Sequence, residues 1–458
     1  MRDMKNKGLL ETEDFGTVRR CLELTRKFGA DAARVKVVKS VETSVCSRDG
    51  ELDSISYKAG KGVFFYVLAG GRSGFFEAHN FDDTLEEVIR DGVEKTKLLT
   101  PDPPKLLPPK ELKAIGMTRG DELDLVDPSF NDITVDRRTA LVRRLASAVR
   151  PSSGEWHPLS MECEYYDSLY DTYMIDSEGF EGRNTNSGFS YGAFVTIEDN
   201  DGNKYSGART RFSICLDELK ADGVTDEAFA LAAAKLHPRG IRSGRYNVVV
   251  DRVCGARLLS PLLDALDALS IQQKYSFLCG RLGERVFADS LNIIDRQAER
   301  HKTGSAPFDR WGVECREMKI IEKGVILTYY TDAETSARTG FPITPSECLR
   351  PCIEPFICNC NEKEITLERI LSESGEGIYI TDFNGGNTNP ATGEFSFGIE
   401  GFAFRDGRIM HPVKNALMTG DMISLWNRIY AAGSDPRDDV AAQIPTLAFK
   451  GIDISAQL

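Results

Sequence analysis

Apolar positions in the first hundred residues switch between helical and strand-like spacing. Over residues 12–29 they recur every three or four positions among charged side chains, which predicts a helix with one buried face. Two runs rich in β-branched and aromatic residues follow, from Arg34 and from Gly60. The Gly70-Gly71 pair inside the second run predicts a hairpin turn, and a second helix follows it. We therefore expect an N-terminal α+β domain over residues 1–100.

The middle of the chain begins with a proline-rich segment, PDPPKLLPP, which disfavours helix and predicts a linker over residues 101–125. Residues 126–240 are expected to form a central α+β domain. A helix is predicted from Asp136, and the alternating pattern over 160–215 predicts an antiparallel sheet with a hairpin turn at Asp201-Gly202. An alanine-rich helix closes this domain.

Strand-like runs dominate the remainder, which we predict to be a β-rich C-terminal domain over residues 241–458. Hairpin turns are expected at Gly385-Gly386 and Asp406-Gly407, and a last helix over 420–433. A helix with Pro261 in its first turn is also predicted. Strands and helices come in blocks, which favours an α+β fold: N-terminal domains of mixed helix and strand, then a domain rich in antiparallel strands.

Charge and hydropathy narrow the function classes. The chain has 57 basic and 70 acidic residues, a net charge of −13, so direct binding of nucleic acid is disfavoured. Its N-terminus lacks an apolar signal segment, and no run approaches the roughly 18 apolar residues of a membrane span. We expect a cytoplasmic protein that does not enter a membrane, with its 11 cysteines reduced.

Local motifs offer little catalytic chemistry. Ser190 lies in a G-x-S-x-G pattern, but a strand-like run follows it where a nucleophile elbow needs a helix. A helical metal site needs two histidines about one turn apart, and none of the five is so placed: His79, His157, His237, His301 and His411. The sequence therefore predicts no catalytic residue, no metal ligand and no cofactor bound by this chain.

Four cysteines follow one another at unusual spacing: Cys348, Cys352, Cys358 and Cys360. Their C-x3-C-x5-C-x-C pattern fits neither paired zinc knuckles nor a redox C-x-x-C motif. Both a structural zinc site and buried strand thiols remain open for this cluster.

Four long segments carry a likeness to a known family. They are GVFFYVLAGGRSGFFEA from Gly62, YSFLCGRLGERVFADSLNIID from Tyr275, the stretch from Pro307 to Gly340, and GIYITDFNGGNTNPATGEFSFGIEGFAFRDGRIMHPV from Gly377. The most specific piece is NPATGEFS, residues 389–396, followed by an aromatic-glycine strand. These segments resemble the PmbA (TldE) branch of the TldD/PmbA family. The likeness extends over nearly the whole chain.

This resemblance implies a cytosolic protein, formerly called a modulator of DNA gyrase, that works with a TldD-like subunit as a peptidase. In that pair the TldD-like subunit carries an H-E-x-x-x-H zinc helix. The corresponding segment here, from Leu258, is LLSPLLDALD, which has neither histidine nor glutamate. The resemblance therefore implies zinc in the partner subunit and catalysis only together with it, because zinc hydrolysis needs a metal-bound water and a base.

Four residues are expected to contact a peptide: Asn384, Asn387, Asn389 and Ser396. The first three lie in a loop beside the predicted strand 395–401, which we expect to accept an extended peptide by strand addition. Alternatively, the asparagines and glycines only form a turn.

The leading hypothesis is a non-catalytic subunit that presents peptides or unfolded segments to a zinc-bearing TldD-like partner. Two alternatives remain: a regulatory protein that acts on another assembly such as DNA gyrase without proteolysis, and an autonomous hydrolase with an unrecognised site. In isolation we expect a homodimer, with the final domain supplying the interface, because several of its strands are apolar on both faces.

Overall fold

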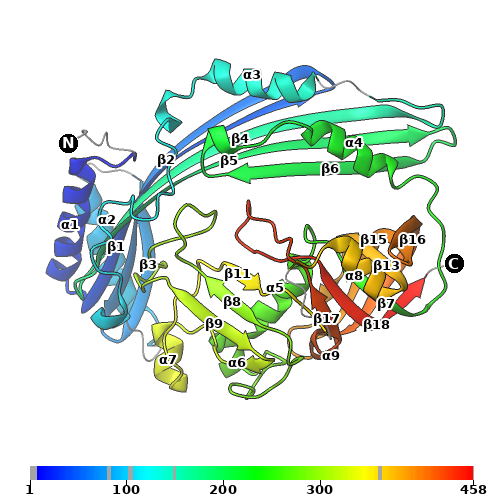
Figure 1. Ribbon diagram of the computed structural model, residues 1–458. Helices are drawn as coiled ribbons and strands as arrows, with labels where there is room; N and C mark the ends of the chain where they lie inside the picture. Colours follow the sequence, from blue (N-terminus) through cyan, green and yellow to red (C-terminus); the bar gives the residue numbers. More distant parts are fainter. Residues whose placement is uncertain (1–7, 80–83, 102–106, 148–150, 359–363, 457–458) are drawn as a thin grey trace. The chain divides into compact units, whose positions relative to one another are not determined.

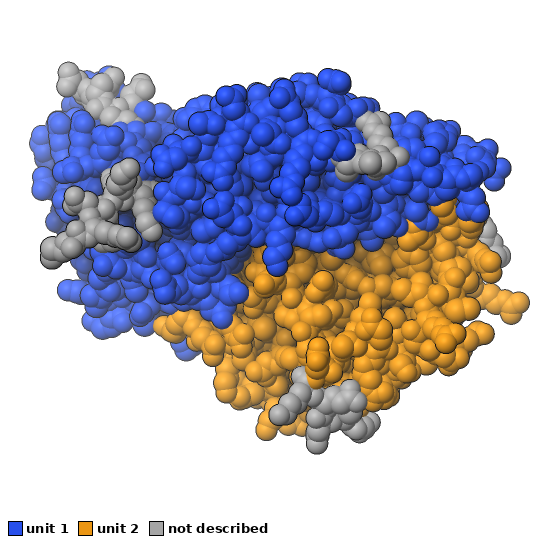
Figure 2. Space-filling model, turned by 45° about the horizontal axis from the view of Figure 1, so that its top comes forward, with its two compact units in different colours: residues 1–233, 298–315, 332–348 blue, residues 234–297, 316–331, 349–458 orange. Residues whose placement is uncertain are grey.

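The computed structural model describes residues 8–79, 84–101, 107–147, 151–358 and 364–456. The chain forms two compact units, coloured separately in Figure 2. Unit 1 comprises residues 1–233, 298–315 and 332–348, and unit 2 comprises residues 234–297, 316–331 and 349–458. Most of the proline-rich segment predicted as a linker lies outside the described residues.

A single antiparallel sheet of six strands forms the centre of unit 1, in the order β3-β2-β1-β4-β5-β6 (Figure 1). The strands are β1 (Ala32–Arg48), β2 (Glu51–Ala69), β3 (Arg72–Ala78), β4 (Trp156–Asp176), β5 (Glu181–Asp199) and β6 (Lys204–Ser213). β1 pairs with β2 on one side and with β4 on the other along almost its whole length. Strands from the predicted N-terminal and central domains therefore belong to one sheet. The hairpin turns predicted at Gly70-Gly71 and Asp201-Gly202 are confirmed.

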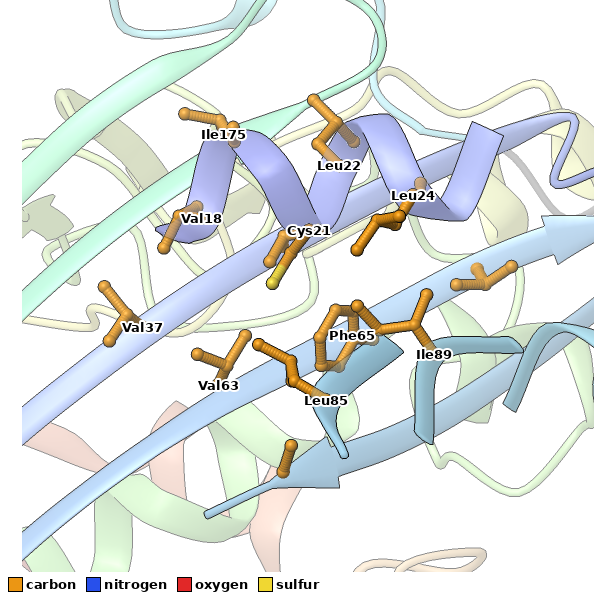
Figure 3. Close-up of a cluster of buried hydrophobic side chains, with 14 of the residues drawn as sticks. Val18, Cys21, Leu22, Leu24, Val37, Val63, Phe65, Leu85, Ile89 and Ile175 are labelled. Carbon is orange, nitrogen blue, oxygen red and sulfur yellow. The ribbon is translucent and has the colours of Figure 1, made fainter. Parts of the chain in front are cut away.

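In the part of unit 1 that the structure describes, five helices and three single 3₁₀ turns accompany the sheet. The elements are α1 (Thr12–Lys27), α2 (Leu85–Leu98), α3 (Val135–Ala146), α4 (Val224–Ala233), α7 (Ala333–Thr339), η1 (Lys110–Leu112), η2 (Phe130–Asp132) and η3 (Leu216–Glu218). The apolar stripe of α1, including Val18 and Leu22, packs with Ile89 of α2 around Phe65 of β2 (Figure 3). Burial raises the pKa of Cys21 in this cluster to about 12, so that its thiol is neutral and acts as a small apolar side chain. Helices α1 and α2 thereby bury the faces that their spacing predicts, whereas Ala140 on the predicted face of α3 is exposed.

Unit 2 contains a small closed barrel of five strands. Its members are β7 (Gly244–Val250), β13 (Glu376–Phe383), β15 (Glu394–Arg405), β16 (Arg408–Asp421) and β18 (Leu447–Ala456). β18 pairs with β16 on one side and with β7 on the other, which closes the ring. Three short strands extend the sheet: β12 (Phe356–Ile357), β14 (Asn387–Thr388) and β17 (Ile429–Ala432). The expected α+β fold with a strand-rich C-terminal part is confirmed.

The described residues of unit 2 also form a second sheet and four helices. The sheet holds β8 (Ile293–Arg296), β9 (Glu317–Glu322), β10 (Val325–Ile326) and β11 (Pro351–Ile353); the helices are α5 (Ala256–Ala265), α6 (Ala268–Gln272), α8 (Leu367–Ser374) and α9 (Met422–Asn427). The prediction of one helix over 420–433 was wrong in its second half, because residues 429–432 pair with β12 and β18 as β17. Tertiary pairing overrides the helical spacing there.

The strands of unit 2 that are apolar on both faces are covered within the chain. On β13, Tyr379 packs in a cluster with Ile370 and Leu371 of α8, whereas Ile378 and Ile380 point to the other side of the strand and are also buried. Helix α8 thus covers one face of β13, and the side chains of the barrel interior cover the other face. The argument that this face needs a partner molecule was therefore wrong.

Among the described residues, no helix combines the length and apolar character required to cross a bilayer.

Candidate functional site

Helix α5 lies where the resemblance places a zinc helix. The carbonyl oxygen of Asp251, at the end of β7, accepts hydrogen bonds from the N–H groups of Cys254 (3.1 Å) and Gly255 (3.0 Å). This turn starts the helix at Ala256, so Pro261 lies in its interior and not in its first turn as predicted. The proline lacks the N–H that would bond to the carbonyl of Arg257.

The buried face of α5 is packed with leucine. Leu258, Leu259 and Leu262 are at most 1% exposed. The two nearby carboxylates have no catalytic placement: Asp267 caps α6 by accepting the Ser270 N–H at 2.8 Å. Desolvation and the neighbouring Asp267 raise the pKa of Asp264, which projects from the exposed side of the helix. The buried face of α5 therefore carries only leucine and alanine side chains.

Cys254, directly before α5, is the nearest thiol to this helix. Its Sγ lies 3.5 Å from the carbonyl oxygen of Asp251 and 3.7 Å from that of Ile380. Burial, followed by the nearby carboxylates of Asp251 and Asp382, raises the pKa of Cys254 far above its ordinary value. A thiol held in the protonated form is a poor nucleophile, so Cys254 has a structural role.

Arg257 links the first turn of α5 to the asparagine-rich loop. Its Nη2 donates a hydrogen bond to the carbonyl oxygen of Gly386, and its guanidinium lies over the ring of Phe397 at 5.1 Å. Neither contact could be inferred from the sequence, because Arg257 and Gly386 are 129 residues apart. Helix α5 and the loop therefore form one local site within unit 2.

Asn384 and Asn389 shape this loop. The N–H of Asn384 donates to the carbonyl of Gly398 at 2.9 Å, and its side chain lies so close that a Cβ on Gly398 would be 2.0 Å from Asn384 Oδ1. Asn389 Oδ1 accepts the Ala391 N–H at 3.0 Å, as in an Asx turn. The alternative that the asparagines only form a turn therefore accounts for the side chains of Asn384 and Asn389.

Asn387 and Ser396 are placed differently. They face each other across the β14–β15 pair, and both are exposed. Neither side chain hydrogen-bonds to any other described residue. Gly386 permits this arrangement, since its φ is +84° and a Cβ there would lie 1.9 Å from the Ser396 carbonyl oxygen. Two polar side chains are thus presented side by side on the surface, available to an external hydrogen-bonding group.

Strand addition to residues 395–401 is ruled out. On one side β15 pairs with β14 and β13, and on the other side with β16, so its backbone groups are already used. The prediction of an open strand was wrong because β15 lies inside the sheet, between β13 and β16, and local alternation does not reveal which strands flank it. Any contact with a peptide at this site must use side chains.

A small pocket of about 80 Å³ adjoins this surface. Phe395 and Thr419, the latter opposite Ser396 on β16, contribute to its lining together with Arg428 and Asp453. The pocket can hold one small chemical group but is too small for a peptide.

The remaining motif residues do not gather into a site. Ser190 is in the middle of β5, paired with Tyr166 and Phe212, so the strand-serine interpretation is confirmed. Cys352 is buried in β11, whereas Cys358 is exposed after β12. Cys348 is half-buried, and Cys360 lies outside the described residues.

Comparison with known proteins gives the class of the chain. Three domain models of the PmbA/TldA metallopeptidases match it: domain 1 over residues 33–96, the central domain over 128–236 and the C-terminal domain over 243–456. The chain belongs to the PmbA/TldD metallopeptidase family.

Individual relatives agree with this assignment. Metalloprotease PmbA of Escherichia coli O157:H7 is 22% identical over 89% of this chain and 88% of its own length. The crystal structure of a proposed modulator of DNA gyrase from Bacteroides thetaiotaomicron superposes with a TM-score of 0.92 at 29% identity, covering 98% of this chain and 100% of that one. TldE from Thermococcus kodakarensis shares the fold, with a TM-score of 0.77 at 17% identity over 96% of this chain and 100% of that one.

Proposed function

We propose that this chain is the non-catalytic, substrate-presenting subunit of a cytoplasmic TldD/TldE-type metallopeptidase. The observation that carries the proposal is the leucine-packed face of α5, at the place where a TldD-like subunit would hold its zinc ligands and its base. Hydrolysis of a peptide requires an activated water and a group to receive its proton. A chain without these groups on α5 would depend on a zinc-bearing partner for the chemistry.

The part played by this chain would be recognition of the substrate. Asn387 and Ser396 each offer hydrogen-bond donors and acceptors, which suit the amide groups of a peptide or an unfolded segment. Asn384 and Asn389 would hold the loop in the conformation that presents them. Zinc would reside in the partner subunit.

Co-purification with an H-E-x-x-x-H homologue from the same cell tests this proposal. The purified pair is given an unstructured peptide, and its degradation is compared with that by each chain alone and by a pair whose partner has the motif glutamate replaced by glutamine. We expect degradation by the intact pair only.

Two outcomes would reject the proposal. One is degradation by this chain alone at the rate of the pair, which would support an autonomous hydrolase. The other is an H-E-x-x-x-H partner whose activity is the same with and without this chain.

Regulation of DNA gyrase is a second candidate, supported by the description of the similar Bacteroides protein. It predicts a change in gyrase supercoiling when this chain is added without any peptidase partner. An unchanged rate of supercoiling favours the peptidase proposal.

In the absence of its partner, we expect the chain to form a homodimer. The surface that binds the partner is uncovered when the subunit is alone, and dimers are the commonest oligomers formed by a single kind of chain. Strand β13, which is covered on both faces within the chain, is not part of that surface. Sedimentation velocity over a range of concentrations should show a dimer, and a monomer at all concentrations would contradict this expectation.

A further inference from the structure

Three potential metal ligands from distant parts of the sequence meet in unit 1. They are Cys215, Glu218 and His301, and their ligand atoms all lie within 4.8 Å of one another. His301 Nε2 is 3.0 and 3.1 Å from the two carboxylate oxygens of Glu218. No spacing motif could reveal this group, since the histidine is 83 residues from the glutamate.

Local structure brings the first two ligands together. Cys215 is the N-cap of the 3₁₀ turn η3, and Glu218 is its last residue. The turn places the thiol of Cys215 and the carboxylate of Glu218 close together, within reach of His301. The backbone here is fixed by Asp127, whose Oδ2 accepts the Leu216 N–H at 2.8 Å.

The loop that carries His301 is held in an unusual conformation. His301 has a φ of +57°, and its N–H donates to the carbonyl oxygen of Leu123 at 2.8 Å. Its Nδ1 lies 3.0 Å from the carbonyl oxygen of Asp124. A proton on Nδ1 therefore leaves the Nε2 lone pair directed at Glu218 and Cys215, and metal-binding histidines are commonly oriented by such a carbonyl.

The spacing of these atoms can accommodate a metal ion. In a tetrahedral zinc site, with Zn–N and Zn–O near 2.0–2.2 Å and Zn–S near 2.3 Å, neighbouring ligand atoms are roughly 3.3–3.6 Å apart. The His301–Glu218 distances of 3.0 and 3.1 Å are those of a hydrogen-bonded pair and lie slightly below that range, and all three ligand atoms lie within 4.8 Å of one another, so a small rearrangement would bring them to metal-ligand spacing. The surroundings are also acidic: the Asp124 carboxylate is 3.6 Å from His301 Nδ1.

We propose that Cys215, Glu218 and His301 bind one divalent transition-metal ion, zinc being favoured by the mixed sulfur, nitrogen and oxygen donors. The ion would cross-link the η3 segment to the loop at residues 299–302, and water would complete its coordination. This site is structural and independent of the proposed peptidase partnership.

The described residues contain a second group of three possible metal ligands, which differs from the first. Cys46 lies near Glu162 and Glu164. It lacks a histidine, and Arg48 Nη2 already donates to Glu162 at 3.0 Å. Cys46 therefore serves as a control for cobalt binding by an unrelated thiol.

Cobalt(II) is the probe, because a cysteine ligand gives a sulfur-to-cobalt charge-transfer absorption. The metal-free, reduced full-length chain is titrated with cobalt(II) and then with zinc(II). We expect one equivalent of cobalt to produce the band and zinc to abolish it by displacement. Cys215→Ser should remove the band, and His301→Gln should weaken binding at least tenfold, since loss even of an outer partner costs about 10–100-fold.

Matched controls are Cys46→Ser and His157→Gln, which should leave the titration unchanged, while circular dichroism verifies folding of every variant. Absence of a charge-transfer band in the wild-type chain would overturn the proposal and identify His301–Glu218 as an ion pair. A band that survives in folded Cys215→Ser would overturn it as well.

Discussion

Arg257 and Gly386 are joined by a hydrogen bond from the guanidinium to the carbonyl oxygen, although helix α5 and the asparagine-rich loop are far apart in sequence. The same guanidinium stacks over Phe397, so the loop is held from the first turn of α5. The contact connects helix α5 to the loop that presents Asn387. Arg257 is therefore a positioning residue for the loop.

Arg257→Ala should loosen the loop without unfolding unit 2. One exposed hydrogen bond and one cation–π contact are together worth about 1 kcal/mol, which corresponds to about a fivefold change in local opening. Hydrogen exchange of the amides in residues 384–389 should accelerate by that factor. Arg252→Ala is the control, because Arg252 is also exposed but bonds to the Asp435 carbonyl. Equal exchange in both variants would contradict the role given to Arg257.

Replacing Asn387 and Ser396 together by alanine should reduce peptide degradation by the two-subunit enzyme. Both side chains are exposed, so the change in unfolding free energy should stay within about 0.5 kcal/mol. A loss of peptide affinity with unchanged Tm would separate recognition from folding. The control is Ser372→Ala, an exposed serine on α8. If the double variant degrades peptide at the wild-type rate, recognition takes place elsewhere.

Local features of the fold were predictable from the sequence. The helix at residues 12–27 follows from its apolar stripe, and the turns at Gly70-Gly71 and Asp201-Gly202 follow from the conformations that glycine permits. Each of these predictions depends only on residues that are a few positions apart in the sequence. The same applies to Asn389, whose turn-forming role is common for asparagine.

Long-range pairing was not predictable. Pairing of β15 with β13 on one side and β16 on the other removed the free edge expected at residues 395–401, and pairing of β17 with β12 and β18 shortened the last helix. The contact between Arg257 and Gly386 and the meeting of Cys215 with His301 depend equally on the fold. The absence of histidine and glutamate from LLSPLLDALD could be inferred from the sequence, but the burial of its leucines could not.

Leu262→Ala should destabilise unit 2 by about 2–5 kcal/mol, because the side chain is fully buried and its removal leaves a cavity. Ser260→Ala on the exposed side of α5 should change the stability by less than about 0.5 kcal/mol. Urea unfolding of the two variants measures the difference. Similar stabilities of the two variants would mean that α5 is loosely packed. They would weaken the argument that α5 has a packing role in place of a catalytic one.

Asp309 in unit 1 should make stability depend on pH. Its Oδ1 accepts the N–H groups of Trp311 (2.8 Å) and Val313 (3.0 Å), and its Oδ2 lies 3.3 Å from the Ser346 nitrogen. Burial raises the pKa of Asp309 from 3.8 to about 6, and the hydrogen bonds only partly oppose this. The folded state therefore keeps a proton that the unfolded state has already lost between these two pH values.

The sign of the effect follows from this difference in bound protons. Stabilisation by the protonated carboxyl is complete below pH 3.8 and falls as the pH rises to 6, by about 3 kcal/mol in total for a shift of this size. Asp309→Asn cannot titrate and serves as the reference, since other groups change both proteins equally. The unfolding free energy of the wild type minus that of the variant, measured in urea from pH 4 to 7, should decrease through this window and then level off. A difference that is constant, or that increases with pH, would show that the three N–H donors outweigh burial and keep the carboxylate charged.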